Sequence, residues 1–66
     1  MKIIVLHDRF SNEPAVIRVD TINMIKGVKD DGEVYSELLI NDMCFAVKEN
    51  IGIVMNKIRK AESEDK

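Results

Sequence analysis

The sequence predicts an α+β domain: a small antiparallel, strongly twisted sheet of four to five strands with a single C-terminal amphipathic helix. Three observations support this class. The chain of 66 residues has room for one domain only. As far as Lys48, short runs rich in β-branched residues are separated by turn residues. After Asn50, the spacing of apolar residues changes from two to that of a helix. We place the domain at residues 1–61 and treat residues 62–66 as a frayed polar tail.

The first two strands are expected at residues 1–8 and 15–20. The segment "MKIIVLHD" carries apolar side chains on both alternating faces, a pattern typical of a strand that is covered on both sides. The segment "RFSNEP" that follows contains Ser11, Asn12 and Pro14, which favour a loop. In "AVIRVD" apolar and charged residues alternate, so this segment is the expected antiparallel partner of the first strand.

Three further strands are expected, joined by tight turns. Residues 20–22 can form one turn of helix or 3₁₀-helix before the third strand begins. The segments "DDG", residues 30–32, and "ND", residues 41–42, predict the two turns, because Asp, Asn and Gly tolerate the positive φ of tight hairpins. The strands expected from these boundaries are 24–29, 33–40 and 43–48.

The last element is an amphipathic helix. Its apolar residues follow the spacing of one helical stripe, at Ile51, Val54, Met55 and Ile58. Asn50 is a suitable N-cap, because its side chain can accept a hydrogen bond from an N–H of the first turn. A single helix of this length covers one face of a four- or five-stranded sheet and leaves the other face open.

The composition excludes several classes of protein. Hydrophobic residues make up 45% of the chain and charged residues 33%, with a net charge of −2, which suits a folded core and not a disordered chain. One cysteine and one histidine allow neither an internal disulfide nor a Cys/His zinc site. We expect no metal and no cofactor. The early apolar run "IIVL" is too short for a signal segment or a membrane span. Together with the lone thiol, these features predict a cytoplasmic protein.

The strands contain more apolar surface than one helix can cover. By alternation, the face under the helix is expected to carry Ile3, Val5, Ile17, Val19, Leu38, Ile40, Phe45 and Val47. The opposite face is expected to carry Ile4, Leu6, Val16, Tyr35, Leu39, Cys44 and Ala46. A curled sheet, a second copy of the chain or a different protein can cover such a face. We expect a homodimer, because closed twofold dimers are the commonest oligomers. The interface residues expected are Ile4, Leu6, Val16, Tyr35 and Leu39.

No residue pattern points to catalysis. Cys44 lies in an apolar strand segment, so it is expected to pack as a small buried hydrophobe and not to act as a thiolate. His7 is expected at the surface end of a strand, on the face opposite Cys44. The acidic residues Asp30, Asp31 and Glu33 lack the ligand spacing of a calcium loop and are expected to form a solvated hairpin. The sequence therefore predicts a non-enzymatic interaction or assembly module.

The alternative function is a transcriptional or phage-type regulator that binds nucleic acid. Such a protein needs a basic surface. The residues that can form a modest basic patch are Lys26, Lys29, Lys57, Arg59 and Lys60. The negative net charge and the absence of an aromatic ladder weigh against this alternative.

Three segments carry a resemblance to a known family: "VIRVDTINMI", "YSELLINDMCFAVKENI" and "IVMNKI". In order, they resemble the FlbD-like small flagellar and swarming-motility proteins. The matching residues are Asp20, Ile22, Ile25, Val47, Lys48, Glu49, Asn50, Ile51, Val54 and Ile58. The same pattern is more distantly similar to the β-rich core of LytTR-type DNA-binding domains. The resemblance implies a non-enzymatic, cytoplasmic, β-rich interaction or regulatory module.

Overall fold

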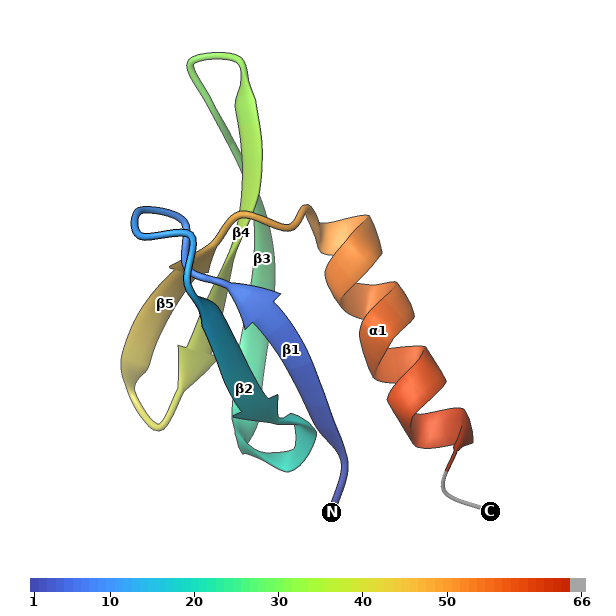
Figure 1. Ribbon diagram of the computed structural model, residues 1–66. Helices are drawn as coiled ribbons and strands as arrows, with labels where there is room; N and C mark the ends of the chain where they lie inside the picture. Colours follow the sequence, from blue (N-terminus) through green and yellow to red (C-terminus); the bar gives the residue numbers. More distant parts are fainter. Residues whose placement is uncertain (65–66) are drawn as a thin grey trace.

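The structure is a computed structural model, and it describes residues 1–64. It contains five strands, one turn of 3₁₀-helix and one α-helix, which confirms the α+β class (Figure 1). In chain order the elements are β1 Ile3–His7, β2 Pro14–Arg18, η1 Val19–Thr21, β3 Ile22–Asp30, β4 Glu33–Ile40, β5 Met43–Val47 and α1 Ile51–Ser63. The helix therefore continues two residues past the predicted domain boundary at residue 61. Residues 65 and 66 of the predicted tail lie outside the described residues.

The strands form two antiparallel sheets instead of the single sheet that was predicted. One sheet consists of β1 and β2, and the other has the order β3-β4-β5. The physical reason is the turn η1, which redirects the chain after β2, so that β3 pairs only with β4. The sheets are joined at one point, an antiparallel bridge between Asp8 and Val47. There, Arg9 N donates to Ala46 O at 3.0 Å and Lys48 N donates to His7 O at 2.9 Å.

Both predicted tight turns are present, and their backbone explains the residue types. Asp31 and Gly32 have φ of 53° and 84°, and Asn41 and Asp42 have φ of 50° and 68°. Positive φ at both central residues is the geometry of a two-residue hairpin, and Asp, Asn and Gly adopt it most readily. The β3–β4 hairpin projects beyond the rest of the molecule (Figure 1).

The core lies between the two sheets and the helix. Its buried hydrophobic residues are Ile4, Leu6, Ile17, Leu38, Val47, Val54 and Ile58. The helix lies alongside β1 (Figure 1) and contributes the apolar stripe predicted for it, with Val54 and Ile58 buried. Asn50 is the N-cap, as predicted, and its Oδ1 accepts from Ile53 N at 2.9 Å.

The prediction of which face is buried was wrong for β1. Ile4 and Leu6 are 5% and 0% exposed, whereas Ile3 and Val5 are 48% and 40% exposed. All four positions are apolar, so alternation alone cannot identify the inner face, and a one-residue shift exchanges the two sets. The tertiary contact that decides the choice is with β2, where Ile4 pairs with the buried Ile17.

The chain exposes more surface than a monomer of its mass usually does. Its accessible surface is 4754 Å², whereas a folded monomer of 7.5 kDa exposes about 4,250 Å². Its radius of gyration is 11.6 Å, against about 10.8 Å for a compact domain of this length. A surplus of about 500 Å² follows from the first pair of numbers.

Candidate functional site: a groove between two strand edges

A largely apolar groove runs between β2 and β5 on the surface of the described residues. Its volume is about 290 Å³. We call it the β2–β5 groove. Its lining is mostly apolar and consists of Asp8, Ala15, Val16, Ile17, Arg18, Thr21, Ile40, Phe45, Ala46 and Val47. Asp8 lies where the bridge to Val47 joins the two sheets, so this junction bounds one end of the groove.

The groove exists because β2 and β5 each pair with only one neighbour along most of their length. β2 pairs with β1, and β5 pairs with β4. Apolar side chains beside these strands remain in contact with solvent, with Val16 67%, Met43 60% and Phe45 40% exposed. Phe45 was predicted to lie under the helix, but it lies at the groove wall instead. The site is therefore an apolar depression flanked by two strand edges.

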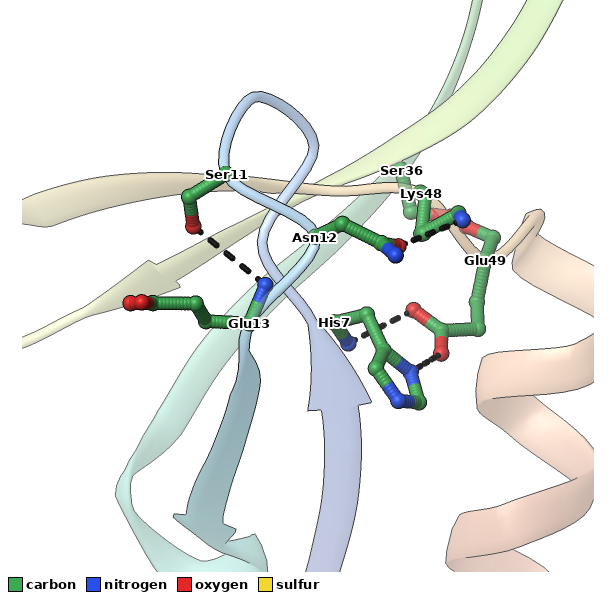
Figure 2. Close-up of polar contacts among 7 residues, drawn as sticks. All are labelled: His7, Ser11, Asn12, Glu13, Ser36, Lys48 and Glu49. Carbon is green, nitrogen blue, oxygen red and sulfur yellow. Dashed lines mark hydrogen bonds and ion pairs between the residues drawn. The ribbon is translucent and has the colours of Figure 1, made fainter.

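A polar cluster lies near the junction between the sheets, where β1 ends and the segment between β5 and α1 passes (Figure 2). Glu49 binds His7 through both carboxylate oxygens. Oε1 accepts from the His7 backbone N at 3.0 Å, and Oε2 lies 2.7 Å from His7 Nδ1. A carboxylate can only accept, so Nδ1 carries the proton of this contact. The pair ties the end of β1 to the residue that precedes the helix cap.

Two further contacts hold the same segment. Ser36, which is fully buried, donates from Oγ to the Glu49 carbonyl at 2.8 Å. Lys48 Nζ donates to Asn12 Oδ1 at 2.6 Å, which fastens the β1–β2 loop (Figure 2). Burial by itself raises the pKa of Glu49, but the hydrogen bonds from the His7 side chain and backbone outweigh it and hold the pKa below its usual value. The ionised Glu49 therefore contributes to the fold at neutral pH.

The β1–β2 loop is organised by Asp8. Its Oδ1 accepts from Phe10 N at 2.8 Å and Ser11 N at 3.0 Å. The hydrogen bond from Ser11, followed by that from Phe10, lowers the pKa of the Asp8 carboxyl. Arg9 extends from this loop over the Tyr35 ring, with the guanidinium 3.9 Å from the ring centre, and donates to Glu33 Oε1 at 3.2 Å. The loop is thus attached to the β3–β4 hairpin.

The five residues predicted for an interface fall into three settings. Ile4 and Leu6 are buried in the core of the single chain, so their expected position on the outer face was wrong. Val16 lines the β2–β5 groove. Tyr35 and Leu39 are half-buried in β4, where Arg9 covers the Tyr35 ring.

Cys44 is exposed, which corrects the expectation that it packs as a buried side chain. The predicted face was right, because Cys44 pairs with Leu39 on the side of β4 opposite Leu38 and Ser36. No helix or strand of residues 1–64 covers that side, and the thiol faces solvent. The contact between His7 and Glu49, 42 residues apart, was not predicted from sequence. No local pattern connects a strand-end histidine with a glutamate next to a helix cap.

The basic residues predicted for nucleic-acid contact lie on two elements, β3 and α1. Gly27, next to Lys26 in β3, lies against Ile51 at the start of α1. Lys57 and Lys60, by contrast, flank a depression beside Ile3 and Val5. At about 1.5 Å per residue, these helix positions are about 9–14 Å farther along the axis than Ile51. Contact of Lys26, Lys29, Lys57, Arg59 and Lys60 with nucleic acid stays a prediction.

Among residues 1–64, no three His, Cys, Asp or Glu side chains gather closely enough to hold a metal ion. Among residues 1–64, no helix is long and apolar enough to cross a membrane.

No match was found among family models, curated proteins or solved structures. The resemblance to FlbD-like and LytTR-type proteins stays a prediction.

Proposed function

We propose that this protein is a small non-enzymatic interaction module that self-associates, most simply as a homodimer. The observation that carries the proposal is the β2–β5 groove, an apolar depression flanked by two strand edges. Surfaces of this kind on small domains mark sites of protein–protein contact. The contact residues of the proposal are Val16, Met43 and Phe45, in place of the buried Ile4 and Leu6.

The size of the core supports the same proposal. A single core in a chain below 70–80 residues rarely supplies more than about 3–5 kcal/mol. Here the core consists of seven buried hydrophobic residues, and neither a disulfide nor a zinc site assists it. Association that buries Val16, Met43 and Phe45 adds apolar burial that the single chain lacks. We assign the protein to the cytoplasm, because an exposed, unpaired Cys44 suits a reducing compartment.

The test is the solution mass, measured by light scattering over a dilution series. The expected result is a mass of two chains that persists to low micromolar concentration. Phe45→Glu places a charge in the groove and is expected to yield single chains. Phe10→Glu is the matched control, because Phe10 is 80% exposed in the β1–β2 loop, outside the groove lining, and its replacement is expected to leave the mass unchanged. A single-chain mass for the unmodified protein at every concentration would refute the proposal.

A further inference from the structure

We draw no further inference here: the strongest candidate, the outer face of the β3-β4-β5 sheet on which Met24 and Cys44 are exposed, is a sheet face without a partner, and nothing among residues 1–64 shows what covers it.

Discussion

Replacing Glu49 by Gln tests the polar cluster that fastens the helix segment to β1. The Glu49 side chain is 11% exposed and contacts His7 twice, at 3.0 Å from the backbone N and at 2.7 Å from Nδ1. A glutamine keeps one carbonyl oxygen for the backbone N–H but places an NH₂ group or a neutral oxygen against the ring nitrogen. A hydrogen bond to a charged group contributes about 1.5–3 kcal/mol, and a neutral one about 1 kcal/mol.

The expected loss in the free energy of unfolding at pH 7 is therefore about 1–2 kcal/mol. For a domain of this size, 1 kcal/mol corresponds to about 4–8 °C in Tm. The assay is thermal and urea unfolding followed by circular dichroism at a fixed protein concentration, because association also raises Tm. Glu62→Gln is the control, since Glu62 is exposed on α1. Its replacement is expected to change the free energy of unfolding by less than about 0.5 kcal/mol.

The pH dependence of stability tests whether the charge of Glu49, and not only the shape of its side chain, stabilises the fold. The folded protein holds the pKa of Glu49 below the ordinary value of 4.5, so the contribution of its charge is complete above pH 4.5 and is lost as pH falls through the folded pKa. The difference in stability between the unmodified protein and Glu49→Gln should therefore be largest at neutral pH and shrink below pH 4.5. A difference that stays constant down to pH 3, or no difference at pH 7, would refute the role assigned to the carboxylate.

Three further substitutions probe other parts of the fold. Leu6→Ala empties a fully buried site and should cost about 2–5 kcal/mol, enough to unfold most of the chain at 25 °C by circular dichroism; a folded, stable variant would contradict its place in the core. Asn50→Ala removes the cap that binds Ile53 N and should cost about 1 kcal/mol in urea unfolding, whereas Asn50→Asp should retain most of it. Gly27→Val forces a side chain against Ile51, because a Cβ added at residue 27 would lie 3.2 Å from Ile51 Cγ2, so a loss of about 1–3 kcal/mol is expected; unchanged stability would mean that Ile51, 41% exposed, moves aside freely.

The polar cluster and the groove show why the site was harder to predict than the fold. Both join segments far apart in sequence: His7 and Glu49 are 42 residues apart, and β2 and β5 are separated by a whole hairpin. Val16 was the one predicted interface residue that lines the groove, because its neighbours in "AVIRVD" alternate clearly. Leu6 was misplaced because "IIVL" is apolar on both faces, and the pattern contains no preference between them.

The sequence by itself determined the features that depend on neighbouring residues. The turns at Asp31–Gly32 and Asn41–Asp42, the cap at Asn50 and the stripe of Val54 and Ile58 follow from backbone preferences and from the helical period. Only the tertiary structure decided the division into two sheets, the inward face of β1 and the exposure of Cys44. These depend on how the chain turns at η1 and on which strand edges meet, and such long-range packing leaves no local signal in the sequence.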